Sequence, residues 1–170
     1  MSKTSLKIIL VRISADLAAT VQLFKDYVAW LDIDLAFQAF DAELASMPGK
    51  YAAPSGELLL ARDTVGIAVG CVAIRPLSSG CCEVKRLWVA PAGRGLGVGR
   101  ALVAAVIEAA RRRGYGEMRL DTLPMMGAAI GLYESLGFER CEKYYETPIE
   151  GTVFLRKVLG EGVEDGKESD

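Results

Sequence analysis

The chain contains no histidine among its 170 residues. This absence excludes Ser-His-Asp and Cys-His catalysis, and it removes a ligand on which most zinc sites depend. A general base in this protein must therefore be a carboxylate, a tyrosine, a lysine, a thiol or a relayed water. We expect no metal cofactor.

Cysteine and long apolar runs are also scarce. The four cysteines, Cys71, Cys81, Cys82 and Cys141, lack metal-ligand spacing, and a chain of this length does not need disulfides, so we expect buried free thiols. No apolar run reaches the roughly 18 residues of a membrane span, and the N-terminal stretch lacks the features of a signal peptide. We therefore expect a cytoplasmic protein with no membrane partner.

The chain carries little excess charge. Its net charge is −2, and residues 160–170 hold five acids and one base, which leaves 19 bases and 17 acids on residues 1–159. A near-neutral body gives no sign of a nucleic-acid partner. Hydrophobic residues make up 51% of the chain. We therefore expect a single folded domain over residues 1–159 and a disordered acidic tail over residues 160–170.

Hydrophobic periodicity predicts alternating strands and helices. Ser14 is a candidate N-cap for the first helix, and Pro48 ends the second. We expect strands at 6–12, 58–62, 67–75, 83–89, 118–122, 140–145 and 152–158, and helices at 14–31, 37–47, 98–113 and 128–136.

The order of these elements predicts the fold class. A helix between strands 83–89 and 118–122 implies a crossover connection, so these two strands should be parallel neighbours. The hairpins elsewhere imply antiparallel neighbours. We therefore expect an α/β fold with a mixed, mostly antiparallel central sheet and helices on both faces.

Four glycines lie between a predicted strand and a predicted helix, at positions 93, 95, 97 and 99. The first N–H groups of a helix are unpaired, and glycines let a ligand approach them. A phosphate or pyrophosphate suits this site, and Arg94 and Arg100 add positive charge. The spacing fits neither the P-loop, which needs a lysine, nor the G-x-G-x-x-G dinucleotide motif.

Two segments resemble a known family. Residues 94–99, RGLGVG, resemble the Q/R-x-x-G-x-G/A pyrophosphate loop of the GNAT N-acetyltransferase superfamily. Residues 130–138, IGLYESLGF, resemble the Leu-Tyr-Glu-x-x-Gly-Phe helix end of the same family. The two motifs together cover roughly residues 82 to 140, and the predicted strand order also agrees with the acyl-CoA N-acyltransferase fold.

The resemblance implies an N-acetyltransferase that moves an acetyl group from acetyl-CoA to a primary amine by direct attack in a ternary complex. In the family the fourth and fifth strands splay apart and the pantetheine arm lies between them. The Val89 N–H would then donate to the thioester carbonyl and to the oxyanion. A non-catalytic acyl-CoA-binding sensor module is the alternative. The implied cofactor-binding residues are Leu87, Trp88, Val89, Arg94, Gly95, Leu96, Gly97, Val98, Gly99 and Arg100.

The resemblance also implies the catalytic groups. Tyr133 matches the tyrosine that faces the coenzyme A sulfur, and its ordinary pKa near ~10 suits a general acid; the alternative is a tyrosine packed at a helix end. Glu83 matches a general-base glutamate of the histone-acetyltransferase branch. Two alternatives remain for Glu83. It could be a structural partner of Lys85 or Arg119, or a water chain could serve as the base instead of Glu83. Met126 stands where the family often has a cofactor-contacting asparagine.

The acceptor is expected to be a small-molecule or peptide amine, held by the first two helices, the loop after them and the last hairpin. Tyr144 and Tyr145 should point to opposite faces if they lie in a strand. Family precedent and the edge strand of the last hairpin also allow a homodimer. Candidate acceptor-pocket residues are Asp32, Asp34, Gln38, Tyr51, Tyr144 and Tyr145.

Overall fold

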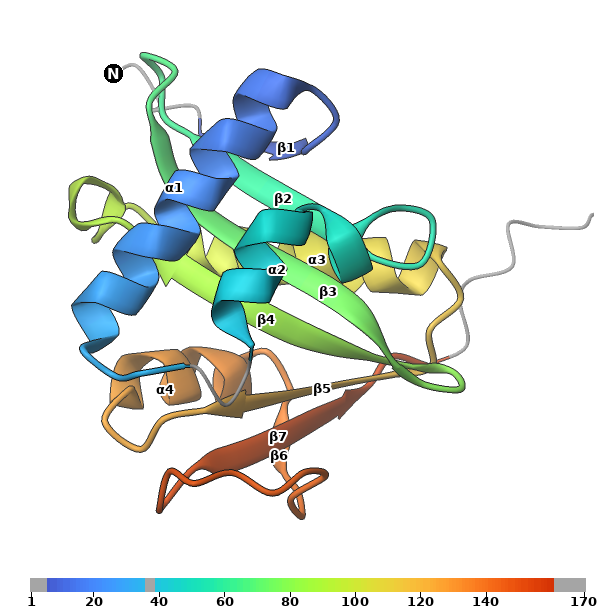
Figure 1. Ribbon diagram of the computed structural model, residues 1–170. Coiled ribbons are helices and arrows are strands. Elements are labelled where there is room, and N and C mark those ends of the chain that lie inside the picture. Colours follow the sequence, from blue (N-terminus) through green and yellow to red (C-terminus); the bar gives the residue numbers. More distant parts are fainter. Residues whose placement is uncertain (1–5, 36–38, 161–170) are drawn as a thin grey trace, which may run out of the picture.

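The computed structural model describes residues 6–35 and 39–160. Its strands form one seven-stranded sheet in the order β1-β2-β3-β4-β5-β7-β6 (Figure 1). Predictions for Phe37, Gln38 and residues 161–170 lie outside the described residues. None of the helices in the described part of the chain is both long and apolar enough to cross a bilayer.

The observed elements follow the predicted order. Ser14 is the first residue of the first helix rather than its N-cap; Ile13 is the N-cap, and no side chain caps the helix. The strands are β1 Lys7–Leu10, β2 Glu57–Arg62, β3 Ala68–Ser78, β4 Cys81–Val89, β5 Glu117–Thr122, β6 Glu139–Arg140 and β7 Val153–Val158, and the helices are α1 Ser14–Leu31, α2 Phe40–Ser46, α3 Val98–Arg112 and α4 Gly127–Ser135.

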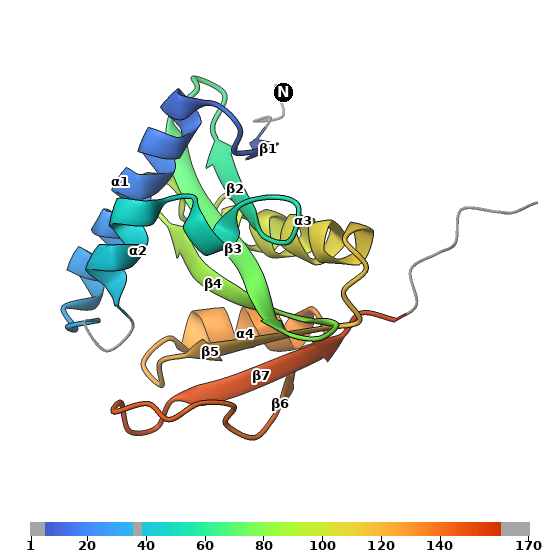
Figure 2. The same cartoon turned by 45° about the vertical axis from the view of Figure 1, so that its right-hand side comes forward.

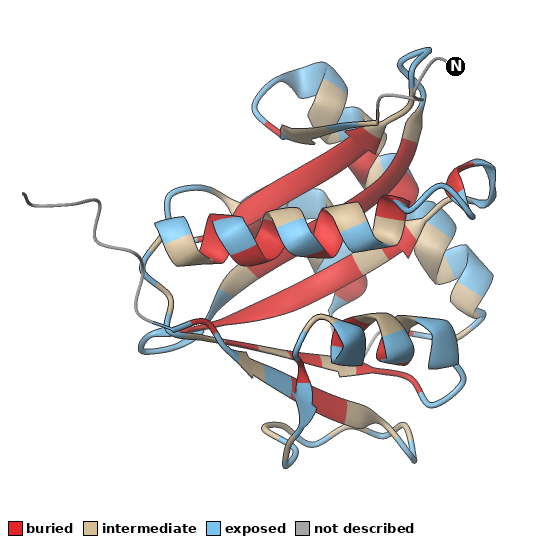
Figure 3. Cartoon of the chain, turned by 180° about the vertical axis from the view of Figure 1, so that it is seen from behind, coloured by how far each residue is buried: buried red, intermediate tan, exposed pale blue. Residues whose placement is uncertain are grey.

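Helices cover both faces of the sheet, as predicted (Figures 1 and 2). Side chains alternate along β2: Leu58 and Leu60 join the core under α1 and α2, while Leu59 and Ala61 join the core under α3. Figure 3 shows the buried side of α3 lying on buried strands. Because β2 and β3 contribute to both cores, residues 58–61 and 69–74 are apolar on both faces.

The predicted parallel pair, β4 and β5, is confirmed, and it is short. Only Cys81–Glu83 of β4 pairs with Glu117–Arg119 of β5. Beyond these three residue pairs the two strands diverge, and Figure 2 shows them separating toward their C-terminal ends. A widening gap therefore opens between the two halves of the sheet.

A β-bulge changes the direction of β4 beside this gap. Trp88 pairs with Cys71 and Lys85 pairs with Ala73, so two residues of β4 lie opposite one residue of β3. Arg86, one of the two, has a positive φ of 60°, which is uncommon for a residue with a side chain. Bulges often change the aim of side chains next to active sites.

The last hairpin differs from the prediction. The expected strand over residues 140–145 contains only Glu139–Arg140 of β6, and Tyr144 and Tyr145 lie in a bend. Their rings lie 5.2 and 5.5 Å from the ring of Phe154 on β7. The expected strand is therefore wrong at these tyrosines, because aromatic packing replaces strand pairing here, and the condition for their pointing to opposite faces is not met.

Candidate functional site

Three adjoining cavities follow the gap between β4 and β5. We call the first the tryptophan groove; its volume is about 450 Å³, and Trp30, Trp88 and Arg94 line it. The second, the central cavity, has a volume of about 60 Å³ and includes Tyr133. The third, the charged pocket, has a volume of about 370 Å³ and includes Glu83.

The cavities share walls. Leu87, Met126 and Ala129 line both the tryptophan groove and the central cavity. Lys85 and Arg86 line both the central cavity and the charged pocket. Ala129 and Tyr133, four residues apart on α4, both line the central cavity. The site is thus a row of three spaces with Tyr133 in the middle one.

The N-terminus of α3 lies beside the tryptophan groove. Gly97 is its N-cap, no side chain caps it, and its first turn contains no acidic residue. The first bond within the helix is donated by the Ala101 N–H to the Gly97 carbonyl at 3.1 Å. The N–H groups of Val98, Gly99 and Arg100 therefore have no partner within the helix, and they suit an anion.

The four glycines of this loop serve two purposes. Gly95 and Gly97 have positive φ values of 81° and 73°, and a Cβ at either would meet nothing within 4 Å. A Cβ on Gly93 would lie 2.9 Å from the Val69 Cβ, and one on Gly99 would lie 3.3 Å from the Leu132 Cδ2. Two glycines thus permit the loop conformation beside open space, and two permit close packing of the loop and α3.

The two arginines of the loop are held in different ways. The Arg94 guanidinium lies over the rings of Trp30 and Trp88, with its central carbon 5.7 and 5.2 Å from the ring centroids. Arg100 donates to the Ser135 hydroxyl at 2.9 Å. Trp88 Nε1 is buried and has no hydrogen-bond partner among the described residues. The two arginine cations and the unpaired Trp88 Nε1–H therefore lie around the tryptophan groove and the glycine loop.

The end of β4 presents its backbone to the gap. The Ala90 N–H donates to the Val69 carbonyl of β3 at 2.9 Å. Because the direction of hydrogen bonding alternates along an antiparallel strand, the Val89 N–H points away from β3. It therefore points into the gap on the β5 side, beside the tryptophan groove that Leu87, Trp88 and Val89 line.

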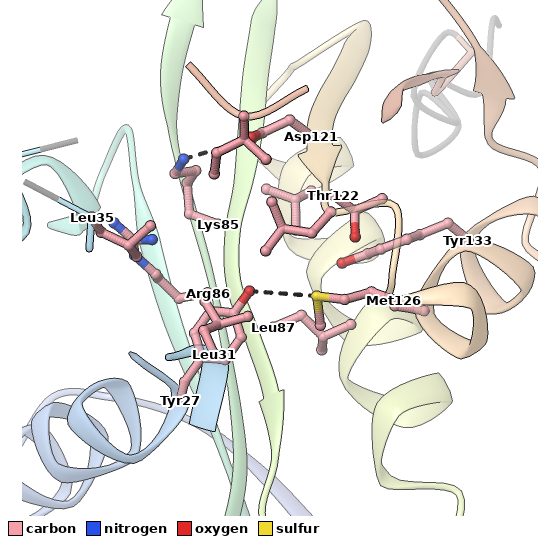
Figure 4. Close-up of a pocket in the computed structure, with 14 residues that line it drawn as sticks. Tyr27, Leu31, Leu35, Lys85, Arg86, Leu87, Asp121, Thr122, Met126 and Tyr133 are labelled. Atoms are coloured by element: carbon pink, nitrogen blue, oxygen red, sulfur yellow. Dashed lines mark hydrogen bonds and ion pairs between the residues drawn. The ribbon is translucent and has the colours of Figure 1, made fainter. Parts of the chain in front are cut away.

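Tyr133 projects from α4 into the central cavity (Figure 4). Its side chain is 4% exposed, and its ring lies 5.3 Å from that of Phe138. Burial raises the pKa of Tyr133 above its ordinary value, with smaller contributions in the same direction from Tyr27 and Asp121. The hydroxyl therefore stays protonated at neutral pH, as a proton donor requires.

The central cavity is closed on the side of α1. The Tyr27 hydroxyl donates to the Met126 sulfur at 3.9 Å, so the residue at the family's asparagine position holds α1 against the start of α4 (Figure 4). Lys85 lies 3.7 Å from Asp121, and burial lowers the pKa of Lys85. Asp121 also accepts a hydrogen bond from Tyr145 at 2.6 Å.

Glu83 lies in the charged pocket, one cavity away from Tyr133. It is 1% exposed, accepts from Arg75 Nε at 2.8 Å and accepts from the Tyr144 hydroxyl at 2.6 Å. Arg119, one expected partner, pairs instead with Glu117 at 3.2 Å. The register of the β3–β4 hairpin, in which Arg75 lies opposite Glu83, is the signal that sequence reasoning missed.

Sequence reasoning also missed a network between α2 and β4. Glu43 accepts from Arg86 Nε at 2.9 Å and from the Tyr51 hydroxyl at 2.6 Å. Glu43 and Arg86 both line the charged pocket. Three separate segments supply these groups, so no local spacing could have found them.

Other expected residues lie elsewhere. Tyr51 is 2% exposed and serves the Glu43 network rather than an open wall. Asp32 ends α1 in a left-handed conformation with a φ of 52°. Met125 is 64% exposed and lines the tryptophan groove. Three of the cysteines are buried free thiols, as predicted, and Cys141 is half-buried.

Comparisons with known proteins agree with this geometry. A family model described as "Acetyltransferase (GNAT) family" matches residues 17–138. An uncharacterized N-acetyltransferase of Schizosaccharomyces pombe is 42% identical over 157 residues, covering 92% of this chain and 96% of that protein. A second, from Dictyostelium discoideum, is 29% identical and covers 80% of this chain and 91% of its own length.

Solved structures share the fold. An acetyltransferase of the GNAT family from Staphylococcus aureus superposes with a TM-score of 0.76 at 18% identity, covering 91% of this chain and 99% of its own. The Salmonella typhimurium protein yncA, solved with its cofactor acetyl-CoA, gives a TM-score of 0.65 at 22% identity, covering 95% and 98%. With the family model and the Schizosaccharomyces relative, this fold establishes that the chain belongs to the acetyltransferase (GNAT) family.

Proposed function

We propose that the protein transfers an acetyl group from acetyl-CoA to a primary amine by direct attack in a ternary complex. The observation that carries this proposal is the row of three adjoining cavities, with Tyr133 between the tryptophan groove and the charged pocket. Such a row lets two substrates enter from opposite ends and meet beside one proton donor.

The tryptophan groove and the α3 N-terminus fit coenzyme A. The uncapped N–H groups of residues 98–100 and the open space beside Gly95 and Gly97 suit a diphosphate. Arg94 and Arg100 supply positive charge. The Val89 N–H and the orphaned Trp88 Nε1 are donors beside the groove for a polar extended chain.

Acetyl-CoA would supply the acetyl group as an activated thioester. The Val89 N–H then donates to the carbonyl oxygen, where negative charge develops as the amine attacks. The Tyr133 hydroxyl donates its proton to the departing sulfur, and its raised pKa keeps that proton available at neutral pH. No residue needs to form a covalent intermediate, which suits a chain without histidine.

Glu83 is the proposed acceptor of the proton that the attacking amine loses. It lines the pocket from which the amine would enter. Because Glu83 does not line the central cavity in the described residues, we propose that a water molecule carries the proton to it. Arg75 and Tyr144 hold both of its oxygens in position.

Replacement of Tyr133 by Phe tests the proposal. The ring still packs against Phe138 while the proton donor is lost, so we expect kcat to fall by about 10²-fold or more. The affinity for acetyl-CoA should stay within about twofold. Steady-state release of coenzyme A thiol measures kcat, and calorimetry measures binding.

Tyr115→Phe is the matched control, because the Tyr115 hydroxyl donates to the Ser55 carbonyl at 2.6 Å, outside the three cavities. It should leave kcat unchanged. Normal turnover in Tyr133→Phe would remove Tyr133 from the mechanism. Acetyl-CoA binding without turnover of any amine by the unaltered protein would favour the acyl-CoA-binding sensor module instead.

A further inference from the structure

The charged pocket carries an excess of cations. Four of its lining side chains are basic and two are acidic, and Asp121, outside the lining, pairs with one of the four, Lys85, at 3.7 Å. A pocket built for a simple ammonium compound would need the opposite balance, because like charges repel in a partly enclosed site. The basic residues are Lys50, Arg75, Lys85 and Arg86, and the acidic ones are Glu43 and Glu83.

Both carboxylates of the pocket are already held by protein groups. Arg86 Nε lies 2.9 Å from Glu43, and Arg75 Nε lies 2.8 Å from Glu83. Hydroxyl groups complete their coordination, since Tyr51 donates to Glu43 and Tyr144 donates to Glu83, each at 2.6 Å. Neither acid is therefore left as an uncompensated negative charge for the acceptor molecule.

Two cationic side chains retain donors that face the pocket without a partner. Lys50 is exposed and makes no ion pair within residues 6–35 and 39–160. Arg75 uses its Nε for Glu83, while its two terminal nitrogens make no hydrogen bond with the described part of the chain. Its side chain is 28% exposed and lines the charged pocket.

We propose that the acceptor amine also carries an anionic group, a carboxylate or a phosphate, which binds in the charged pocket between Lys50 and the terminal nitrogens of Arg75. This inference rests on the proposed function and names the substrate class of the same site. A lysine ammonium and an arginine fork are the groups that bind such anions. The pocket volume of about 370 Å³ suits a molecule of amino-acid size.

The geometry also orients the acceptor. Arg75 binds Glu83 through its Nε, so an anion held by its terminal nitrogens would lie beside the proposed base without displacing it. Lys85 and Arg86 form the shared wall toward the central cavity. The amine of an anchored molecule would then extend toward that wall, on the side of Tyr133.

The test compares matched acceptors under saturating acetyl-CoA. L-methionine and L-phenylalanine are each paired with their primary amide, and O-phosphoethanolamine is paired with ethanolamine. We expect kcat/KM for the best anionic acceptor to exceed that of its uncharged partner by about tenfold or more. The amine of an amino-acid amide is the less basic one, so chemistry alone would favour the amide.

Lys50→Met should lower this anion preference by about threefold to tenfold, and Lys50→Arg should restore it. Lys25→Met, which removes an exposed lysine of α1, is the matched control and should leave the preference unchanged. Raising the salt concentration from 0.05 to 0.5 M should also reduce the preference, because salt screens exposed charges. The preferred pair identifies the anion as carboxylate or phosphate.

The outcomes separate this inference from the function on which it rests. Turnover of the amides or of ethanolamine as fast as their anionic partners overturns the inference and leaves the acetyltransferase proposal intact. If the protein acetylates spermidine or a lysine peptide but none of the anionic acceptors, the inference is also overturned and the acetyltransferase proposal remains. Coenzyme A binding without turnover of any acceptor, or no heat of binding at all, overturns both.

Discussion

Single residues decide whether the loop before α3 can bind a diphosphate. Gly97 has a φ of 73° and open space where a Cβ would lie. We expect Gly97→Glu to weaken coenzyme A binding by at least about tenfold, because its carboxylate would occupy that space and repel the phosphates. Calorimetric titration measures the dissociation constant.

Gly80 offers a close control for this substitution. Its φ is 72°, and a Cβ there would also meet nothing within 4 Å, but it lies in the β3–β4 turn. Both variants should lose about 1–2 kcal/mol of stability from the left-handed backbone. If Gly80→Glu lost as much coenzyme A affinity as Gly97→Glu, the loss would come from the strained backbone and not from a blocked diphosphate site in the loop before α3.

Individual side-chain partners were the least predictable part of the site. The motif at residues 94–99 and the position of Tyr133 could be read from short segments, because each lies within one strand-loop-helix or helix-end unit. The partner of Glu83 depends on strand register, and the partners of Glu43 depend on three segments brought together by folding. Such partners have no local sequence signal.

At the scale of elements, one ion pair attaches α2 to the bulged part of β4. The side chains of Glu43 and Arg86 are 13% and 4% exposed. Because removing one partner leaves a buried charge uncompensated, Glu43→Gln should lower the free energy of unfolding by about 2–4 kcal/mol. Urea denaturation, followed by circular dichroism, measures this change.

The exposed residue Glu108 supplies the matched control. It lies 3.8 and 3.7 Å from Arg111 and Arg112 on the surface of α3 and is 52% exposed. Glu108→Gln should cost less than about 0.5 kcal/mol. If the two glutamate substitutions had equal small effects, Glu43 would not hold α2 in place.

Element order was predictable because apolar residues recur with a helical period in α1 and α3 and as short β-rich runs elsewhere. The last hairpin was predicted wrongly, since the aromatic run at Tyr144 and Tyr145 is typical of a strand. In the structure these rings pack on Phe154 and their hydroxyls bind carboxylates. Side-chain packing here overrides the strand preference of the residues.

At the scale of the whole molecule, buried acidic groups make stability depend on alkaline pH. Burial raises the pKa of Cys82 from 9.0 to about 12, and that of Tyr27 from 10.0 to about 12. Below about pH 8 both groups are protonated in the folded and unfolded states. Above pH 9 the unfolded chain loses protons that the folded chain keeps, so stability should fall as pH rises toward 12.

Unfolding in urea under reducing conditions at pH 8, 9 and 10 measures this dependence. The Cys82 thiol alone should cost about 1 kcal/mol between pH 8 and pH 10. Cys82→Ala should reduce the slope, whereas Cys141→Ala, which removes a half-buried thiol, should reduce it less. Identical slopes in the unaltered protein and Cys82→Ala would contradict the prediction.

The three residue pairs between β4 and β5 also have a mechanical consequence. The sheet divides there into two parts, β1–β4 and β5–β7, and the seam between them has fewer residue pairs than the β2–β3, β3–β4 or β5–β7 ladders. Buried side chains from both parts pack together under α3 and hold the seam closed. A molecule that binds both parts across the gap would add to the few backbone contacts that join them, so its binding should stabilise the sheet as a whole.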